Sequence, residues 1–276
     1  MRVLVAGGTG RLGALVVRRL VDRGVSVRVL TRDASRARPL EGSAVELVEG
    51  DVRRPETLAA AVQDVDVVVS AVHGFVGTGG VSPKSVDRDG NANLVAAAGK
   101  AGAAVVLMSI VGAAPDSSME LFRCKAAAEQ SLRASGVPWT IVRSAAFLEL
   151  WAELVGKGIV FGSGENPINF VSVHDVADVV AEVVLDPGRR GQAIDVIGPR
   201  CLTLNQLADE LRAVSGGPTR VRRVPRWLLH VLAPLHRQPR AALLMDSTDM
   251  THRDLVGARV GPTSPDEALA RAATVA

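Results

Sequence analysis

The N-terminal segment constrains the fold of this chain more than any other stretch. An apolar run at residues 3–5 leads into the turn Gly7-Gly8-Thr9-Gly10-Arg11-Leu12-Gly13, and residues 14–21 continue as a helix without a breaker. Glycines spaced as Gly8-x-Gly10-x-x-Gly13 allow a tight turn, close approach of the backbone to a pyrophosphate, and close packing of helix on strand. Because the following helix points its N-terminus at the anion, the segment predicts a dinucleotide site at residues 7–13. A glycine turn without a ligand is the alternative.

Bulk composition limits the class of protein. The chain has 276 residues, 47% of them hydrophobic, which favours one large α/β core, or one core with a smaller lobe, over disorder. Apolar runs are too short to span a bilayer, the start does not resemble a signal peptide, and two cysteines provide no disulfide framework. We therefore expect a cytoplasmic protein without an integral membrane segment. A formal charge of +3 and 3% aromatic residues argue against a nucleic-acid partner and leave small acidic ligands as partners.

The end of the second predicted strand, residues 25–30, favours NADP over NAD. An NAD site places a carboxylate about 20 residues after the glycines to bind the ribose 2′-hydroxyl, whereas an NADP site offers arginine to a 2′-phosphate. Arg32 stands at this position, with Arg36 and Arg38 close behind, although Asp33 follows at once. A guanidinium forks two hydrogen bonds onto a phosphate, so Arg32 is the candidate for this contact. Arg36 and Arg38 are equally well explained as a solvated loop.

Strands and helices alternate through the first half of the chain. The apolar run at residues 65–70 is typical of a strand buried on both faces of a parallel sheet. Right-handed crossovers then predict the α/β class with a doubly wound parallel sheet. Beyond the second strand we expect strands at residues 45–51, 65–70, 104–108 and 137–143, a helix opened by Pro55, and helices at residues 87–98 and 119–135.

Residues that follow the predicted strands supply further site candidates, because ligands of such sheets bind outside the carboxyl ends of the strands. Asp51 can meet the adenine amino group or cap the next helix. The Gly/Ser-rich stretch 74–85 is interpreted as a mobile loop and a candidate lid. The candidates at strand ends are Asp51, Val52, Ala71, Val72, His73 and Ser109.

The second half of the chain is expected to return elements to the core and to form a small substrate-binding lobe. Residues 168–177 run from a strand into a helix with Asp175 as its N-cap, and Thr203 caps a helix at residues 203–214. A further strand is expected at residues 192–197.

We therefore place an NADP-binding Rossmann core at residues 1–150 and the mixed C-terminal part at residues 151–276. Clustered arginines distinguish residues 220–240 from the rest of the chain. One interpretation is a cap over a substrate cleft with solvated arginines. The alternative is a basic amphipathic segment that contacts a membrane surface or a partner.

With these features in place, the chain resembles the atypical short-chain dehydrogenase/reductases, and among them the NmrA-like NAD(P)-binding proteins. The glycine loop, Arg32, Gly50-Asp51-Val52 and Lys125 carry the resemblance in the first half. Residues 125–143, 173–177 and 198–204 resemble later landmarks of the family, so the resemblance extends nearly end to end. It implies a Rossmann fold with NADP(H), and it adds Lys125 and Arg143 to the cofactor-binding candidates.

The chain departs from the wider superfamily because it contains no tyrosine. In that superfamily a Tyr-x-x-x-Lys pair supplies an acid and a cofactor anchor, whereas here Leu121 stands four residues before Lys125. The resemblance implies that Lys125 contacts the nicotinamide ribose and, in one alternative, donates a proton. Ser109 takes the strand-end serine position, and His73 is either a proton donor or a lid residue without chemistry. Glu129 stands one helical turn after Lys125, which allows an ion pair.

Three functions fit these residues. The primary hypothesis is an NADPH-dependent reductase that transfers a hydride to an electron-poor small molecule such as a quinone, an enone or a related carbonyl, none of which requires the missing phenol. The alternative is a non-catalytic NADP(H)-sensing regulatory protein, which the absent tyrosine favours. A lyase, cyclase or isomerase is the weakest of the three. The substrate and the oligomeric state, with a homodimer as one alternative, stay open.

Overall fold

The computed structural model describes residues 1–33, 35, 44–75, 80–215, 222–232, 237–252 and 254–275. Contacts between Cα atoms divide the chain into two compact units, residues 1–143 with 176–194, and residues 144–175 with 195–276. The boundary expected at residue 150 stays a prediction. Arg36, Arg38 and residues 76–79 of the predicted lid lie outside the described residues.

The first unit alternates strands and helices from its first residue. Its elements are β1 (Arg2–Ala6), α1 (Arg11–Val21), β2 (Ser26–Thr31), β3 (Val45–Glu49), η2 (Pro55–Thr57), α2 (Leu58–Val62), β4 (Val67–Ser70), η3 (Pro83–Arg88), α3 (Asp89–Ala101), β5 (Ala104–Ile110), α4 (Glu120–Ala134), β6 (Trp139–Ser144), α6 (Val173–Leu185), η4 (Pro187–Arg189) and β10 (Gln192–Ile197).

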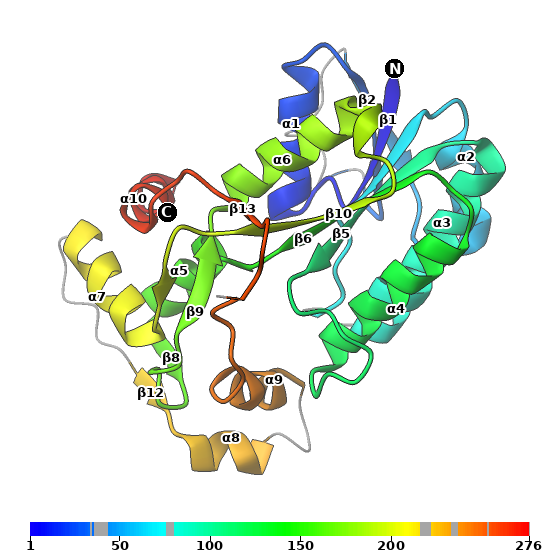
Figure 1. Ribbon diagram of the computed structural model, residues 1–276. Coiled ribbons are helices and arrows are strands. Elements are labelled where there is room, and N and C mark those ends of the chain that lie inside the picture. The colour runs from blue at the N-terminus through cyan, green and yellow to red at the C-terminus, as the bar shows by residue number, and fades with distance from the viewer. Residues whose placement is uncertain are drawn as a thin grey trace. The chain divides into compact units, whose positions relative to one another are not determined.

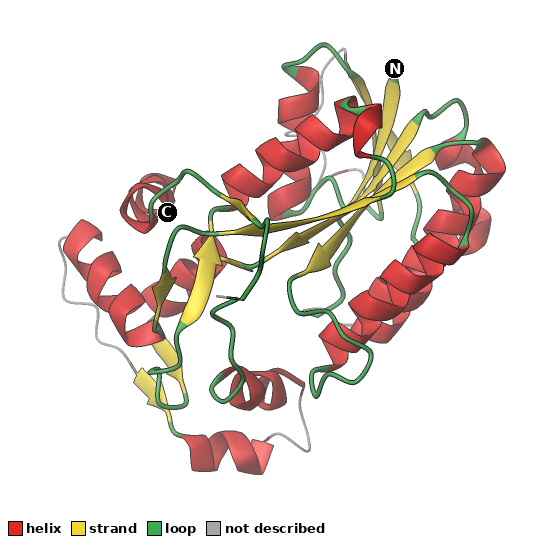
Figure 2. Cartoon of the chain, viewed as in Figure 1, coloured by secondary structure: helices red, strands yellow, loops and turns green. Residues whose placement is uncertain are grey.

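These strands form one sheet in the order β10-β6-β5-β4-β1-β2-β3, and the pairings among β1 to β5 are all parallel. In Figure 1, α1 and α6 lie on one face of the sheet, while α2, α3 and α4 cover the other. Figure 2 shows the same three layers, with the yellow strands between red helices. Reversal of the strand order between β1 and β4 is the mark of a doubly wound sheet, so the predicted fold class is confirmed.

Apolar strands explain why the sheet occupies the middle layer. Residues 3–6 and 67–70 are buried along their whole length, as expected for strands covered by helices on both faces. The helix α1 buries one stripe, including Val16, Val17 and Leu20, against this sheet. On its outer side, Arg19 Nε lies 2.6 Å from Asp178 Oδ1 of α6. The loops at the carboxyl ends of these strands therefore extend from a buried, mostly apolar centre.

The second unit contains shorter strands and several helices. Its elements are β7 (Ala146–Phe147), α5 (Leu148–Gly156), β8 (Ile159–Phe161), β9 (Ile168–Val171), β11 (Cys201–Leu202), α7 (Leu204–Ser215), β12 (Arg222–Val224), α8 (Arg226–Leu232), α9 (Arg237–Met245), β13 (Arg259–Val260) and α10 (Pro265–Val275). One small sheet has the order β11-β9-β7, and β8 pairs with β12 in parallel. The last residues of β10 pair in parallel with β13, which brings the large sheet to eight strands.

The structure corrects the predicted ends of several elements. Asp175 is not the N-cap of α6, because the helix begins at Val173 and the Ser172 hydroxyl accepts the His174 N–H at 3.3 Å. Asp175 instead accepts hydrogen bonds from the backbone and hydroxyl of Thr263, at 3.0 and 2.6 Å. A tertiary partner thus takes the carboxylate that local sequence assigned to a cap.

Of two other predicted boundaries, one differs in the structure and one is confirmed. The predicted loop at residues 74–85 ends in helix, because Ser82 and Ser85 form a reciprocal capping box ahead of the π-helical turn η3. The cap predicted at Thr203 is confirmed, since its hydroxyl accepts the Gln206 N–H at 3.1 Å and the Gln206 side chain accepts the Thr203 N–H at 2.9 Å.

Candidate cofactor and active site

The turn between β1 and α1 is held by its own backbone. Gly7 has a φ of +84°, and its carbonyl accepts the Gly10 N–H at 2.9 Å. A Cβ at Gly13 would lie 2.1 Å from that same carbonyl oxygen, and a Cβ at Gly7 would lie 2.6 Å from the carbonyl oxygen of Ala71. No side chain caps α1 at Gly10, so the first N–H groups of the helix keep hydrogen-bonding capacity for an anion. The turn therefore fits the pyrophosphate of a dinucleotide.

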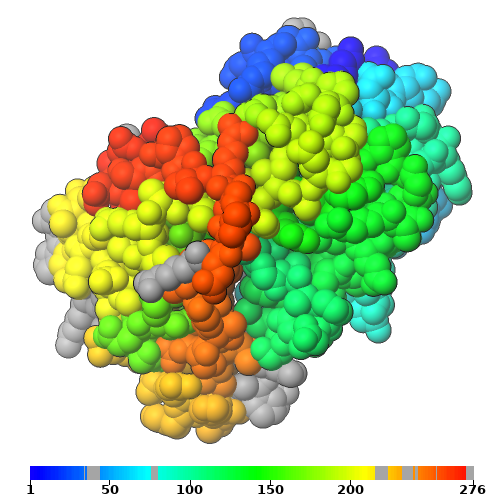
Figure 3. Space-filling model, in the orientation of Figure 1, coloured from blue at the N-terminus to red at the C-terminus, as the bar shows by residue number. Residues whose placement is uncertain are grey.

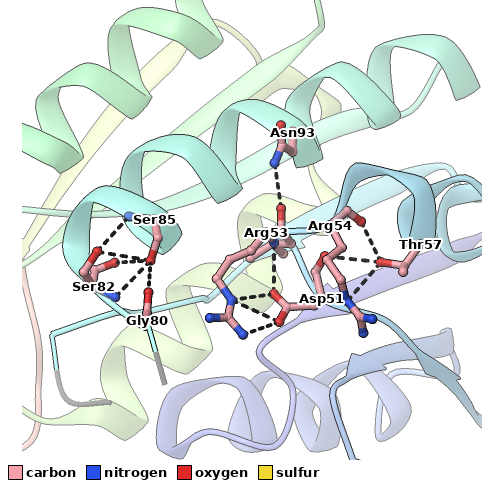
Figure 4. Close-up of polar contacts among 9 residues, drawn as sticks. Asp51, Arg53, Arg54, Thr57, Gly80, Ser82, Ser85 and Asn93 are labelled. Atoms are coloured by element: carbon pink, nitrogen blue, oxygen red, sulfur yellow. Dashed lines mark hydrogen bonds and ion pairs between the residues drawn. The ribbon is translucent and has the colours of Figure 1, made fainter. Parts of the chain in front are cut away.

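Asp51, after β3, is an ionised acceptor already bound to Arg53. Arg53 Nη2 lies 2.6 Å from Asp51 Oδ2, and the Arg53 N–H donates to Oδ1 at 2.9 Å (Figure 4). Burial raises the pKa of Asp51, but the hydrogen bonds of Arg53 and the charges of Arg53 and Arg32 outweigh it and lower that pKa below its usual value. Asp51 does not cap the next helix, whose N-cap is Arg54. A contact with an adenine amino group would have to be shared with Arg53.

Val52 and Arg32 are two further predicted cofactor-binding residues near this pair. Val52 is buried, and its carbonyl accepts the Asn93 side-chain amide at 2.9 Å, which ties the end of β3 to α3 (Figure 4). Arg32, which follows β2, is exposed, so its guanidinium is accessible to a ligand. The assignment of Arg32 to a 2′-phosphate stays a prediction.

A buried ion pair between Lys125 and Asp87 is the most constrained feature of the site. Lys125 Nζ lies 2.9 Å from Asp87 Oδ1, and the two side chains are 8% and 0% exposed. The ammonium also donates to the carbonyls of Met108 at 3.0 Å and Val72 at 3.4 Å. Asp87 Oδ2 accepts the Gly74 N–H at 2.8 Å. Lys125 thus joins the segment after β4 to β5 itself, and the segment after β4 packs on the glycine turn.

His73 completes a row of three titratable side chains. Its Nδ1 lies 3.8 Å from Asp87 Oδ1, and its side chain is 48% exposed and stacked on Phe75. Burial alone would raise the pKa of Asp87, but the charge of Lys125, followed by the contact with His73, lowers this pKa to about 2. The carboxylate is therefore ionised near neutral pH and faces two basic side chains.

Ser109 and Arg143 meet on a second buried carboxylate, that of Glu129. The Ser109 hydroxyl donates to Oε1 at 2.6 Å, while Arg143 donates to Oε1 from Nε at 2.8 Å and to Oε2 from Nη2 at 2.6 Å. Burial raises the pKa of Glu129, but hydrogen bonds from Arg143 and Ser109 outweigh it, so the pKa is lowered. The ion pair considered between Lys125 and Glu129 does not form, because each group has a nearer partner from another element.

Sequence reasoning missed Asp87 and the role of Glu129. Asp87 stood in a predicted helix, and no spacing rule links it to Lys125, which comes 38 residues later (125 − 87). A carboxylate near the start of a helix also has a simpler local explanation through the helix dipole. One signal in the sequence could have indicated that Asp87 is buried. It directly follows the apolar Val86, in a segment that packs into the core.

The second unit contains a small cavity and an exposed basic segment. Trp151, Phe161 and Asp246 are among the residues around a cavity of about 20 Å³, which is room for a water molecule rather than for an organic substrate. Trp227 and Val231 of α8 are 66% and 61% exposed, and α8 lies at the molecular surface (Figure 3, yellow-orange, bottom). Among the described residues, no helix is both long and apolar enough to cross a bilayer. The cap and membrane-surface interpretations of residues 220–240 stay predictions.

Comparison with known proteins identifies the family. A family model described as NAD(P)H-binding matches residues 7–187, which include the glycine turn, Asp87, Lys125 and Glu129. The chain belongs to the NAD(P)H-binding family. This membership confirms the resemblance to the NmrA-like atypical short-chain dehydrogenase/reductases, and the chain carries the family's nucleotide-binding unit.

Named relatives of this NAD(P)H-binding protein differ in role. It is 36% identical to an NAD(P)H azoreductase of Xenophilus azovorans over 79% of this chain and 75% of that protein. It is 31% identical to the photosystem II assembly factor Ycf39 of a Synechocystis strain, over 86% and 74% of the two chains. The triphenylmethane reductase of a Citrobacter species has a similar fold, with a TM-score of 0.75, 22% identity, and coverage of 99% of this chain and 100% of that one.

Proposed function

We propose that this protein is an NADPH-dependent reductase of small electron-poor molecules, such as quinones, enones and related carbonyls. The observation that carries the proposal is the buried pair of Lys125 and Asp87 beside the glycine turn. Burying an ammonium and a carboxylate costs several kcal/mol per ion before they attract each other, so a site that only had to pack would be apolar. The 36% identity to a protein named NAD(P)H azoreductase supports reduction of a small molecule in place of a purely structural role.

Each part of the site has a separate task in this proposal. NADPH, when bound, supplies a hydride. The turn at residues 7–13 binds the pyrophosphate through backbone N–H groups, and Arg32 binds the 2′-phosphate in a way that favours NADPH over NADH. Lys125 keeps its short contacts with Asp87 and Met108 and exchanges its long 3.4 Å contact with the Val72 carbonyl for a ribose hydroxyl.

Substitution of Lys125 by alanine, with NADPH affinity and turnover measured separately, tests the proposal. If Lys125 only anchors the cofactor, the variant should bind NADPH with a Kd raised about tenfold, and its kcat at saturating NADPH should change less than threefold. A proton donor predicts a fall in kcat of about 10²-fold as well. Lys157→Ala is the matched control, since Lys157 is 62% exposed and pairs with Glu153 on the surface of α5. Wild-type protein that binds NADPH but oxidises it with no quinone, enone, ketone, imine or azo compound would overturn the reductase.

A non-catalytic NADP(H)-sensing protein is the second candidate. The similarity to a photosystem II assembly factor and the absence of tyrosine both favour it. In this case the set of bound proteins should change with the nucleotide. Affinity purification of the tagged protein with NADPH, with NADP⁺ and without nucleotide tests this, and an identical set of partners in all three would exclude it.

A further inference from the structure

Asp87 and the turn that carries it make several buried hydrogen bonds besides the ion pair with Lys125. Its Oδ2 accepts the Gly74 N–H at 2.8 Å, so the carboxylate cannot rotate without losing a buried hydrogen bond. Its own carbonyl accepts the Asn91 side-chain amide at 2.7 Å, and the Asn91 oxygen accepts the Ser70 hydroxyl at 2.5 Å. The π-helical turn that carries Asp87 is thereby tied to the end of β4. Such turns occur frequently at functional sites, and here the turn fixes the direction of one carboxylate.

The fixed carboxylate faces two basic groups with one oxygen. Oδ1 lies 2.9 Å from Lys125 Nζ and 3.8 Å from His73 Nδ1. Lys125 alone neutralises the buried charge, so stability does not require a histidine. Because Nδ1 is the nitrogen turned toward Asp87, Nε2 is the nitrogen left for other contacts on a side chain that is 48% exposed. A carboxylate on one ring nitrogen is the usual device by which proteins orient the other.

The other candidate proton donors are already committed. Lys125 donates hydrogen bonds to the carbonyls of Met108 and Val72, and its ammonium is paired with Asp87 Oδ1 at 2.9 Å. The Ser109 hydroxyl donates a hydrogen bond to Glu129 Oε1 at 2.6 Å. His73 combines a titratable proton, contact with solvent from which that proton can be replaced, and a position directly after Val72, whose carbonyl accepts a hydrogen bond from Lys125.

We propose that Asp87 is a positioning residue that orients His73 as the proton donor of the reduction, an inference that rests on the reductase function proposed above. The substrate gains a hydride from NADPH at carbon and a proton from His73 Nε2 at the oxygen of the same carbonyl system. NADPH becomes NADP⁺, the imidazolium becomes imidazole, and solvent returns the proton to the exposed ring. Asp87 keeps its charge throughout, and across the 3.8 Å ion-pair contact that charge favours the proton on Nδ1, as the carboxylate does in other acid–base pairs.

A double-mutant cycle in turnover tests this coupling. Asp87→Asn, His73→Gln and the double variant are compared by kcat at saturating NADPH with menadione as the acceptor. We expect about a 10²-fold loss in His73→Gln and about 10- to 100-fold in Asp87→Asn. If Asp87 acts through His73, the double variant should lie within threefold of His73→Gln. Losses that multiply would overturn the proposal. Asp89→Asn is the control, since this neighbouring acid is 50% exposed and pairs with Arg88.

A second measurement reports on the contact without turnover. Nitrogen-15 chemical shifts distinguish the two neutral tautomers of each of the five histidines, and the signal lost in His73→Gln identifies His73. We expect the Nδ1–H tautomer to predominate for His73 in the wild type and to lose that predominance in Asp87→Asn but not in Asp89→Asn. An unchanged tautomer ratio in Asp87→Asn would overturn the orienting role.

The test still decides the proposal if Asp87→Asn fails to fold or if the wild type reduces no acceptor. Asp87→Asn leaves the Lys125 ammonium buried without its partner, so this variant can fail to fold. In that case the same variants are made in protein that also carries Lys125→Gln, so that both buried charges are removed together. The kcat of the double variant should again lie within threefold of that of His73→Gln. A wild type that reduces no acceptor removes the reductase function and with it proton donation, whereas the tautomer measurement still decides whether Asp87 orients His73.

Discussion

Replacing Gly13 by alanine should disable the site by moving the turn of α1 that binds the cofactor. The new Cβ would lie 2.1 Å from the Gly7 carbonyl oxygen, whereas real Cβ atoms essentially never approach within 3.0 Å, so the helix and the turn must separate by about 0.9 Å (3.0 − 2.1). Overpacking of this kind costs about 1–3 kcal/mol. Weakening the hydrogen bond from the Gly10 N–H to the Gly7 carbonyl adds about 0.5–1.5 kcal/mol. The higher helix propensity of alanine returns about 1 kcal/mol.

The net effect is a loss of about 2 kcal/mol in the free energy of unfolding, measured by urea denaturation. The displaced N–H groups should also weaken NADPH binding about tenfold or more, measured by fluorescence titration. Gly99→Ala is the control, because its Cβ would meet only a side-chain methyl of Val137, at 3.1 Å, and no backbone atom, within a helix. We expect this variant to be as stable as the wild type or slightly more stable, with unchanged NADPH affinity. Wild-type stability together with NADPH affinity within twofold in Gly13→Ala would refute the reasoning.

Two further changes test the electrostatics of the site. Arg32→Glu should lower kcat/KM for NADPH about 10- to 100-fold and change that for NADH less than threefold, because a carboxylate repels a 2′-phosphate; equal losses with both cofactors in steady-state kinetics would contradict this. Glu129→Gln should cost about 2 kcal/mol of unfolding free energy at pH 7, because Arg143 and Ser109 lose a charged acceptor. The pKa of Glu129 is lower in the folded state than in the unfolded state. The stability that its carboxylate adds is therefore fully present above the unfolded value of 4.5 and is lost as the pH falls through the folded pKa. Urea melts at pH 7 and pH 4 should therefore show the difference between wild type and variant shrinking, and a difference that grows at pH 4 would contradict the assignment.

Most of the sheet and the glycine turn follow from local patterns. The run Val67–Val69 is apolar because helices cover both faces of the sheet. The spacing of Gly8, Gly10 and Gly13 reflects contacts made within a few residues. The predicted ends of helices were less accurate where a side chain hydrogen-bonds to a residue distant in the sequence and not to the nearby helix end. Asp175 is the clearest case, since Thr263 takes the carboxylate that a helix N-terminus would otherwise use.

The sequence alone determined the nucleotide-binding fold, the place of the glycine turn and the absence of any tyrosine acid, because each is a property of adjacent residues or of composition. Only the tertiary structure decided which charges meet. Lys125 is one helical turn from Glu129, yet it pairs with Asp87, and Glu129 pairs with Arg143. Strand order places β4 beside β5, so Lys125 contacts both the segment after β4 and a carbonyl of β5. Such contacts between distant residues leave no recognisable spacing in the chain. The physical reason is that burial selects the partner that satisfies a charge in three dimensions, whichever residue lies nearest along the sequence.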